Sequence, residues 1–530
     1  SNRGVPIRNR GYYGRNIHSQ EFLWTAQGTY FNLSTAAIDP VIDEFGNVYV
    51  AGHCNTNGFG HGPLPDTSLG SFLNKYTPDG RLLWSKLSLD YQPRISINLN
   101  LQEIVMTVIS DQGMDLLKYD YNGTLKSKKN LCSKEEGKLA ATARGLSIDG
   151  NNNCYVTGAF TKTALVLGQT ITNSSVDDAH LFVLKIDSQD NLVWIRTSEK
   201  GHIFPHTGIK VNRIGEVFVY GDFLNEIGIA GVSYTAGFNN GFVCKYTSDG
   251  VFQWLLNFGA EAGDYVSSLC VNEDDGSLYA LGKYGGTFEM TPFKLEIKGK
   301  YDSNIFIAKI SGNGILMDLK SVGGIYRDAP GAIYYKNNEV FFTGGFKDTT
   351  NIGGREYISP ENTFESYLAG CDQNLNIKWL TLIGAAAKSE AYAGGLSGDH
   401  EGNLIFTGGF LGSIAFGGQA QQSFGRAMYV AKVADRNPLG INAAGFQNNE
   451  ISVYPVPSSG LVNVSCKTAG VCNVVIEVRD GSGKLFYETA GTSTATDYSA
   501  QIKLPDGARG VYYLSLQING KNVATKQLIR

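Results

Sequence analysis

Short apolar strands that end in glycine recur along most of the chain. They occupy residues 48–52, 154–158, 217–221, 278–282, 340–344 and 404–408. Their glycines are separated by 106, 63, 61, 62 and 64 residues, and the first of these intervals equals two periods. Residues 90–132 fill that interval with a degraded copy of the same pattern. Seven repeats of about 60 residues therefore follow one another.

Each repeat contains the same order of four strands, separated by two tight turns and one longer polar stretch. In the third repeat, the strands are predicted at residues 145–149, 154–158, 181–186 and 192–194. The turns carry Asp-Gly or Asn-Gly pairs, such as Asp79-Gly80, which tolerate the positive φ of a two-residue hairpin. No stretch shows a sustained helical period. Four short antiparallel strands, repeated seven times, predict an all-β fold built as a seven-bladed β-propeller.

Tryptophan marks the fourth strand of several repeats and indicates how the ring closes. It occurs at Trp84, Trp194, Trp254 and Trp379, between 32 and 36 residues after the glycine of each repeat. No tryptophan follows Gly408, whereas Trp24 precedes Gly52 by 28 residues, the same distance that separates Trp254 from Gly282. The N-terminal strand is therefore predicted to complete the last blade, which would tie the two ends of the ring together.

The pattern changes after Asn437-Pro438. Residues 446–530 alternate apolar and polar positions over short strands, for example at 474–478 and 511–516, and turn residues separate these strands. This pattern predicts a small Ig-like β-sandwich. The chain is thus predicted to consist of a flexible N-terminal segment (1–18), a propeller (19–445) and a C-terminal sandwich (446–530).

Composition and charge narrow the class of protein. The chain has 65 glycines in 530 residues, and only 18% of its residues are charged, which is typical of β-rich, turn-rich domains. The net charge of −4 gives no basic field that would favour nucleic acid, and no apolar run is long enough to predict a transmembrane segment. Of the eight cysteines, most lie in apolar strands. Cys466 and Cys472 are spaced so that two antiparallel strands could carry a disulfide across a turn in an oxidising compartment, with two free thiols as the alternative.

The third and fourth strands of the repeats resemble a bacterial β-propeller repeat that reads roughly Asp-Ala-Phe-Val-Ala-Lys, a turn, and Leu-Trp. Residues 304–309 and 428–432 are similar to its third strand. The resemblance covers about residues 19–440 and implies the fold. It does not imply a function, because propellers of this kind serve as enzymes, adhesins and scaffolds.

Four blocks near the C-terminus resemble the type A C-terminal sorting domain of the type IX secretion system. They are residues 454–460, 480–484, 510–514 and 526–530. The motif positions are Tyr454, Pro455, Pro457, Gly460, Asp480, Gly483, Lys484, Gly510, Tyr512, Leu514, Lys526 and Arg530. Val456 departs from the family, which usually has asparagine there. An ordinary Ig-like appendage is the alternative.

This resemblance implies a Bacteroidota protein that a removed signal peptide directs to the periplasm and that the outer-membrane translocon then moves outward. Its implied partners are that translocon and its shuttle and sortase components, which act through the C-terminal domain. The domain is normally cleaved afterwards, and the cargo is released or attached to surface lipopolysaccharide. The implied location is therefore secreted or cell-surface.

The residue pattern predicts no catalytic residues, no metal site and no cofactor. The seven histidines are scattered at positions 18, 53, 61, 180, 202, 206 and 400. His202 and His206 are separated by Pro205 in a strand context, which argues against a helical metal-binding face. His53 and His61 flank a glycine-rich loop and either contact a ligand or are solvated. Acidic pairs such as Asp43-Glu44 are interpreted as turn residues, and Asp149–Asn153 lacks the terminal glutamate of a calcium loop.

The function that these observations favour is a non-catalytic binding or interaction module at the cell surface or outside the cell. Long polar stretches at 159–179, 223–240, 345–365 and 409–426 either recognise an extracellular glycan or protein or form an additional hairpin in each blade. The alternatives are a secreted enzyme that acts on polysaccharide or peptide, with its site in the central channel, and a gliding or adhesion component of the surface.

Overall fold

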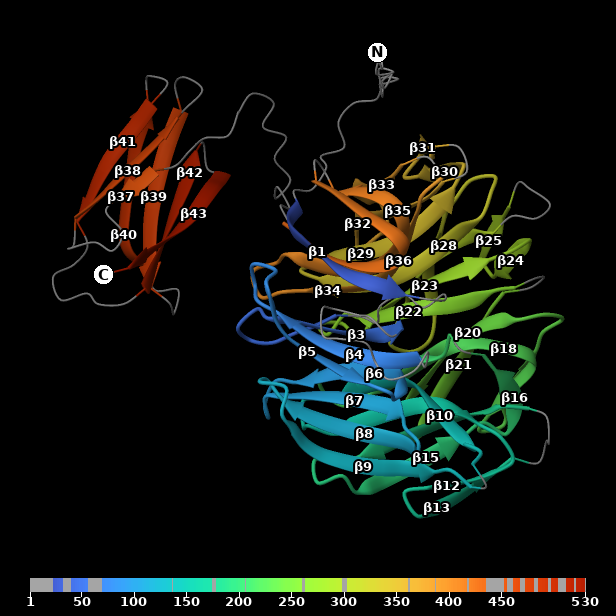
Figure 1. Cartoon of the computed structure of the whole chain (residues 1–530). Coiled ribbons are helices and arrows are strands. Elements are labelled where there is room, and N and C mark those ends of the chain that lie inside the picture. Colours follow the sequence, from blue (N-terminus) through green and yellow to red (C-terminus); the bar gives the residue numbers. More distant parts are fainter. Residues whose placement is uncertain are drawn as a thin grey trace, which may run out of the picture. The chain divides into compact units, whose positions relative to one another are not determined.

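The computed structural model in Figure 1 divides the chain into two compact parts, residues 1–436 and 437–530, which are described separately. The described residues are 22–31, 40–55, 69–135, 137–173, 178–204, 206–259, 263–297, 303–360, 363–386, 388–416, 419–434, 452–454, 461–467, 472–480, 485–493, 497–503, 511–518 and 521–529. Every helix or strand element in these ranges is a strand, which confirms the predicted all-β class.

Five sheets of the N-terminal part share one antiparallel order of four strands. Their strands, in spatial order, are β2 (Val41–Ile42), β3 (Val48–Asn55), β4 (Leu69–Tyr76) and β5 (Leu82–Ser88); β6 (Tyr91–Asn98), β7 (Glu103–Ile109), β8 (Gly113–Asp120) and β9 (Leu125–Ser133); β10 (Ala141–Ile148), β11 (Cys154–Phe160), β14 (His180–Ile186) and β15 (Leu192–Thr197); β17 (Gly208–Val211), β18 (Val217–Ile229), β20 (Asn240–Tyr246) and β21 (Phe252–Phe258); and β22 (Tyr265–Val271), β23 (Leu278–Tyr284), β26 (Asn304–Ile310) and β27 (Leu316–Val322). The second strand of each sheet is the predicted apolar strand, and its buried side chains on both faces match its uninterrupted apolar sequence.

A larger, eight-stranded sheet contains the same order twice. It consists of β28 (Asp328–Lys336), β29 (Glu339–Lys347), β32 (Phe364–Asp372) and β33 (Ile377–Ala385), followed by β34 (Glu390–Gly398), β35 (Leu404–Phe416), β36 (Gln419–Val433) and β1 (Phe22–Phe31). The two halves join because the end of β33 pairs with the end of β35.

The long polar stretches after several second strands form additional hairpins, as one of the two sequence interpretations predicted. These shorter strands are β12 (Thr163–Val166) with β13 (Gln169–Thr172), β19 (Val232–Thr235) beside the extended β18, β24 (Thr287–Met290) with β25 (Phe293–Glu296), and β30 (Thr349–Ile352) with β31 (Arg355–Ile358). A further short strand, β16 (Lys200–Ile203), precedes β17 and also pairs with the extended β18. Val166 of β12 also pairs with Cys132 of β9, so this hairpin extends the preceding sheet.

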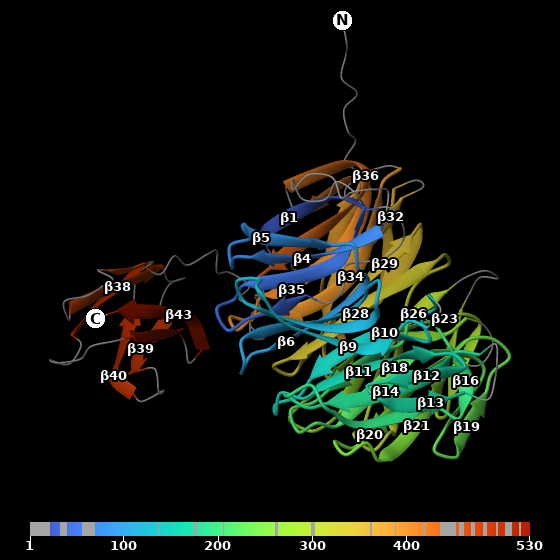
Figure 2. The same cartoon turned by 60° about the horizontal axis from the view of Figure 1, so that its bottom comes forward.

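Strand β1 pairs with β36 near the other end of the N-terminal part, which is the pairing that the spacing of tryptophans predicts. Trp24 lies opposite Lys432 in this antiparallel pair. Figures 1 and 2 show β1, in blue, beside the orange β36. The first and last described strands of this part therefore belong to one sheet.

A repeated contact, which we call the indole latch, joins neighbouring sheets. In each latch, a tryptophan indole N–H of a fourth strand donates to a backbone carbonyl in the turn between the third and fourth strands of the next sheet. The pairs are Trp24 with Pro78 (2.9 Å), Trp84 with Tyr121 (3.3 Å), Trp194 with Ser248 (3.1 Å) and Trp254 with Gly312 (3.2 Å). The ammonium groups of Lys432, Lys75, Lys185 and Lys245 donate to the same four carbonyls.

Glycine is required in the turns that receive these latches. Gly80 has a φ of +87°, and a Cβ at this position would lie 2.5 Å from the ring of Trp24. Gly250 stands in the same relation to Trp194. A side chain at either position would therefore be strained in its backbone and would displace the tryptophan.

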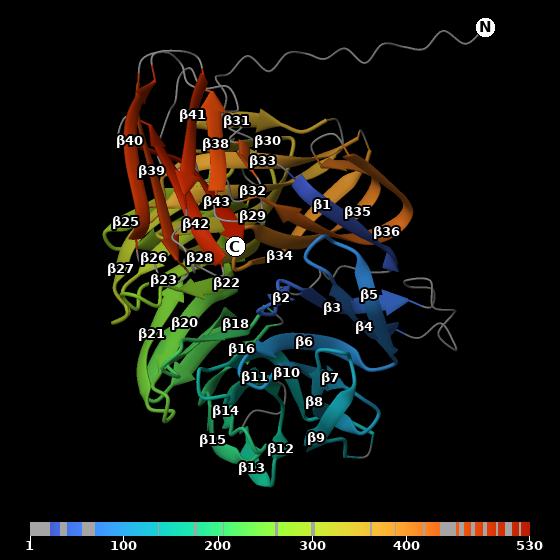
Figure 3. The ribbon, with the colours of Figure 1, turned by 90° about the vertical axis from the view of Figure 1, so that its left-hand side faces the viewer.

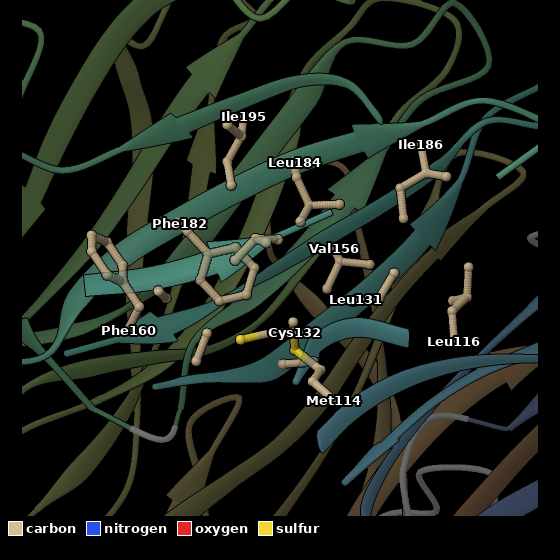
Figure 4. Close-up of a cluster of buried hydrophobic side chains, with 14 of the residues drawn as sticks. Met114, Leu116, Leu131, Cys132, Val156, Phe160, Phe182, Leu184, Ile186 and Ile195 are labelled. Atoms are coloured by element: carbon tan, nitrogen blue, oxygen red, sulfur yellow. The ribbon is translucent and has the colours of Figure 1, made fainter. Parts of the chain in front are cut away.

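Apolar side chains fill the space between neighbouring sheets. Figure 4 shows one such cluster, in which Met114, Leu116, Leu131 and Cys132 of β8 and β9 meet Val156, Phe160, Phe182, Leu184, Ile186 and Ile195 of β11, β14 and β15. Cysteines 132, 154, 244, 270 and 371 are buried free thiols. Burial raises the pKa of the Cys154 thiol to about 12, so this cysteine behaves as a small apolar residue.

The C-terminal part contains two sheets that share one apolar core. The first sheet has the order β37 (Ser452–Tyr454), β38 (Leu461–Lys467) and β41 (Asp497–Lys503); the second has the order β40 (Leu485–Ser493), β39 (Cys472–Asp480), β42 (Val511–Ile518) and β43 (Lys521–Ile529). Buried Val462, Val464 and Ile502 of the first sheet pack against Ile476 and Leu514 of the second. Two layers around one core are the arrangement of a β-sandwich.

Candidate functional sites

A cavity of about 660 Å³ lies among the first strands of the sheets in the N-terminal part. Its lining comes from β2, β6, β10, β17, β22, β28 and β34, together with the residues that directly precede β2 and β17 and follow β22, and from Tyr220 of β18. Each of these first strands contacts the next, and β34 contacts β2, so the strands encircle the cavity. Figure 3 allows six of them, β2, β6, β10, β22, β28 and β34, to be followed around the middle of this part. The cavity is in the size range of sites for small organic ligands.

β-Bulges occur in five of the strands that line the cavity. They interrupt the pairing of β6, β10, β22, β28 and β34 with the second strand of each sheet. Buried threonines of the second strands satisfy two of the displaced amides: Thr343 Oγ1 accepts from Ala332 N (2.9 Å), and Thr407 Oγ1 accepts from Gly395 N (3.0 Å). Bulges turn side chains away from the regular pleat, and here they do so beside the cavity.

The bulges of β6 and β10 bring two arginines, Arg94 and Arg144, to the cavity wall. Arg94 Nε donates to the backbone carbonyl of Arg144 (2.5 Å), and its Nη1 donates to the carbonyl of Pro93 (2.8 Å). Burial, and then the neighbouring charge of Arg144, lower the pKa of Arg94 to about 10. This wall of the cavity is therefore positively charged. The sequence analysis did not select either arginine.

Histidine side chains lie near the cavity but do not form a metal site in the described residues. His206 Nδ1 lies 3.2 Å from the buried carboxylate of Asp222, and its ring stacks on Tyr265 at 4.2 Å. His202 instead lies 3.5 Å from Asp178. The described part of the chain contains no group of three or more His, Cys, Asp or Glu side chains that could hold a metal.

Two histidines singled out in the sequence flank a loop that is only partly described. Burial, and then the charge of Arg94, lower the pKa of His53 to about 4, so His53 is neutral at pH 7 beside this arginine. His61 lies outside the described residues, and so do His18 and Cys54 apart from the Cys54 backbone. The structure thus places His53 near the positive wall of the cavity.

The acidic residues before the second strands are turn residues, as the sequence interpretation held. Asp149 Oδ1 accepts from the backbone N–H groups of Asn151 and Asn153, both at 2.9 Å. Its Oδ2 accepts from Asn153 Nδ2 (2.8 Å) and from the Tyr155 hydroxyl (2.9 Å). Asp43 and Asp399 make the same backbone contacts in their own turns.

Replacing Asp149 with alanine is expected to destabilise the protein by about 2–4 kcal/mol, because several charge-assisted hydrogen bonds of a buried turn are lost together. Thermal or denaturant unfolding of the variant measures the effect. Asp249→Ala is the matched control, since Asp249 is an exposed turn residue in the next sheet. Equal stability of both variants would contradict the structural role of Asp149.

Glu365 of β32 is a buried carboxyl group outside the cavity, and its side chain is only 6% exposed. Its Oε1 accepts from the backbone N–H of Ala385 (3.3 Å), which lowers the pKa, but burial has the larger effect and raises the pKa to about 7. Between pH 4.5 and pH 7, the unfolded chain therefore loses this proton while the folded protein retains it. Stability due to this group is present below pH 4.5 and is lost as the pH rises to 7.

Glu365→Gln is expected to raise the free energy of unfolding by about 2–3 kcal/mol at pH 8 and to leave it nearly unchanged at pH 4.5. The amide keeps the acceptor for Ala385 and removes the ionisation. Urea unfolding of both proteins at the two pH values measures the difference. Glu356→Gln, at an exposed position of β31, controls for the loss of one acidic residue. A gain at pH 4.5 as large as that at pH 8 would exclude this ionisation as the cause.

The predicted sorting motif is only partly within the described residues. Tyr454 ends β37 opposite Asn463 of β38, and Asp480 ends β39 opposite Tyr512 of β42. Leu514 is buried and pairs on one side with Val478 and on the other with Lys526 of β43. Pro455, Pro457, Gly460, Gly483, Lys484, Gly510 and Arg530 lie outside the described residues. Three of the four motif blocks thus meet on the adjacent strands β39, β42 and β43.

The candidate disulfide also concerns positions that are described only in part. Cys466 lies on β38 and Cys472 lies on β39, two strands of different sheets that do not pair with each other. Their backbone partners are Tyr498 and Ser493, respectively. The side chains of both cysteines lie outside the described residues, so the disulfide stays a prediction.

A family model with the description "Secretion system C-terminal sorting domain" matches residues 452–530, which include all seven strands of the C-terminal part. This part is a sorting domain. The sorting domain indicates a cargo protein of the type IX secretion system, exported from the cell or to its surface. In the described residues, no helix of the length and apolarity needed to cross a membrane is found.

Comparisons with other proteins concern the fold. No curated protein matches the chain. Among solved structures, the chain is similar to Pyrococcus horikoshii acylaminoacyl peptidase (13% identity, TM-score 0.39, 82% of this chain and 58% of that chain). It is also similar to the polysaccharide lyase Uly1 (8% identity, TM-score 0.41, 80% and 94%) and to a mutant of Synechocystis apocarotenoid oxygenase (10% identity, TM-score 0.37, 78% and 94%). The chain spans less than two thirds of the length of the peptidase.

Proposed function

We propose that this protein is a non-catalytic binding module that the type IX secretion system delivers to the cell surface or the medium. In this proposal, residues 19–445 form a seven-bladed β-propeller, and residues 446–530 carry the signal for translocation across the outer membrane. The observation that carries the binding role is the cavity of about 660 Å³ encircled by the first strands, because ligand sites in proteins are concave and of this size.

Two features of the N-terminal part support the propeller. One strand order recurs in its sheets, and the indole latch joins neighbouring sheets by the same contact. The pairing of β1 with β36 provides the strand that closes the last blade. Radial repetition of this kind leaves only short edges exposed, which suits a protein that works outside the cell.

The charges around the cavity support binding rather than catalysis. Glu273 is the one carboxylate among the described lining residues, and its Oε2 accepts from the backbone N–H of Arg213 (3.1 Å). Glycoside hydrolysis commonly uses two facing carboxylates, and the described lining does not provide such a pair. His206, the lining histidine, contacts the buried Asp222 rather than a hydroxyl or thiol nucleophile.

The proposed partners follow from the sorting domain and the location. The domain engages the outer-membrane translocon and its shuttle and sortase components in a Bacteroidota host. The exported protein is then released or attached to surface lipopolysaccharide, and its propeller binds an extracellular glycan or protein. No cofactor takes part in this role.

The binding role is tested with the full chain and a panel of extracellular polymers: acidic polysaccharides, neutral polysaccharides and denatured protein. Co-sedimentation or affinity electrophoresis measures retention, and size-exclusion chromatography of the polymer measures cleavage. The expected result is retention of at least one polymer whose size distribution stays unchanged. Shortened polymer would instead establish the alternative, a secreted polysaccharide- or peptide-acting enzyme. Retention of none would contradict the binding role.

A further inference from the structure

The positive wall of the cavity is built from two arginines, Arg94 and Arg144. Arg94 of β6 donates through Nε to the carbonyl of Arg144 and through Nη1 to the carbonyl of Pro93. These bonds fix the orientation of the Arg94 guanidinium group. The Nε of Arg144 is buried and has no hydrogen-bond partner. A buried donor without an acceptor is uncommon in folded proteins and calls for an explanation.

No carboxylate of the described residues forms an ion pair with either arginine. The described lining contains one acid, Glu273, and this residue contacts Arg213 instead. Burial, followed by the charge of Arg144, lowers the pKa of Arg94, and burial lowers the pKa of Arg144. His53 adds no further positive charge on this side, because it is neutral at pH 7. Two guanidinium groups therefore share a desolvated wall without a counter-charge.

Such an arrangement is costly for the empty protein. Buried charges are normally paired, and an unpaired buried charge carries an uncompensated desolvation cost, so an apolar side chain of similar volume in its place is expected to be neutral or stabilising. The opposite side of the cavity is built differently. Gly331 of β28 and Gly394 and Gly395 of β34 lie in bulges, so backbone forms part of this side, beside the side chains of Ile333, Tyr334, Tyr335 and Leu396. The lining residues of β28 and β34 add no charged side chain to the cavity.

We propose that Arg94 and Arg144 form an oxyanion subsite, which binds the carboxylate or sulfate group of an organic ligand held in the cavity. This inference rests on the proposed binding function and specifies its ligand chemistry. The planar guanidinium group presents donors in a fork that matches the two oxygens of a carboxylate or sulfate. The bound oxyanion supplies the missing counter-charge. The remaining volume, beside Tyr220 and Tyr334, accommodates the body of the ligand.

The test uses isothermal titration of the full chain at constant ionic strength with three probes: glucuronate, glucose and inorganic sulfate. Glucuronate and glucose differ in the carboxylate, and sulfate is an oxyanion without an organic body. We expect saturable binding of glucuronate and weaker binding of glucose. Arg144→Met is expected to weaken glucuronate binding about 10- to 100-fold, the effect of losing hydrogen bonds to a charged group. Arg355→Met, at an exposed position of β31, is the matched control and keeps the wild-type affinity.

A second measurement separates ligand binding from a structural role. Without ligand, Arg144→Met is expected to melt at the same temperature as the wild type or above it, because a desolvated charge has been removed. A marked fall in the melting temperature would show that Arg144 serves the fold and would overturn the proposal. Equal affinity for glucose and glucuronate, equal glucuronate affinity of Arg144→Met and wild type, or binding of sulfate without glucuronate would also overturn it. If Arg144→Met still retains the polymer bound by the wild type, the subsite fails while the binding function stands.

Discussion

A chain that ends at residue 445 is expected to remain in the periplasm of its native host, while the full chain reaches the surface or the medium shortened by roughly its sorting domain. The physical reason is that the sorting signal depends on the folded structure of the domain. Asp480, Tyr512, Leu514 and Lys526 come from three separate blocks of sequence and lie on the adjacent strands β39, β42 and β43. Removal of this domain removes the signal that the translocon recognises. We therefore expect almost none of the truncated protein to be found outside the cell.

Cell fractionation with immunodetection and intact-mass measurement of the exported protein test this expectation. A point variant provides a finer comparison: Leu514→Asp places a charge in the core of the sandwich and is expected to abolish export as the truncation does. Glu488→Gln changes an exposed side chain of β40 and controls for the substitution itself. Export of the truncated chain to the same place as the full chain, with neither shortened, would refute the sorting role of residues 452–530.

Deletion of residues 22–31 is expected to destroy cooperative unfolding of the N-terminal part and to cause association of the protein. This deletion removes β1, exposes the edge of β36, and eliminates the latch between Trp24 and the Pro78 carbonyl. It also removes the aromatic contacts of Phe22 with Phe406 and Phe416 in the last sheet. An unpaired strand edge is a template for pairing with another chain.

Thermal unfolding and size-exclusion chromatography measure this effect. Deletion of residues 1–18 is the matched control, because it shortens the same end of the chain and leaves β1 whole. Trp24→Phe separates the latch from the strand: it removes the indole hydrogen bond and is expected to cost only about 1 kcal/mol. If the protein without residues 22–31 stays monomeric and melts within 2 °C of the wild type, closure by β1 does not hold the fold together.

The strands and their closure could be predicted from the sequence because each depends on a local pattern that recurs. The indoles of Trp24, Trp84, Trp194 and Trp254 each reach a carbonyl one sheet ahead, and the distance of Trp24 from Gly52 reveals its place in this series. The turns could also be predicted from local sequence. Asn153 donates hydrogen bonds to the Asp149 carboxylate through both its backbone N–H and its side-chain amide, all within five residues. The choice between recognition loops and hairpins for the polar stretches needed the structure, since their short strands carry weak apolar patterns.

The arginine pair could not be recognised as a site, because Arg94 and Arg144 are isolated arginines in different repeats. Only the bulges and the encircling order of the first strands bring them together. A weak signal was present: Arg94 lies two residues before Ser96-Ile97-Asn98, and Arg144 lies three residues before Ser147-Ile148-Asp149 in the next repeat. Alignment of the repeats on this shared segment places the two arginines one position apart in the first strand of each repeat. The partner of His206, in contrast, follows only from the fold, since Asp222 lies on the next strand.

Strand β1 is synthesised before the other described strands of the N-terminal part, but it pairs last, because its partner β36 is synthesised at the other end of this part. Gln421 of β36 donates to Thr25 of β1, and these two residues are 396 positions apart. The other sheets use strands that lie close together in the sequence, so each can form soon after its residues have been made. The ring therefore stays open until its final repeat has been synthesised. The pairing of β1 with β36 then carries the entropic cost of closing this long loop. Moving residues 19–31 to the position after residue 434 would turn that step into a local hairpin, and a permuted chain of this kind would acquire its finished fold sheet by sheet.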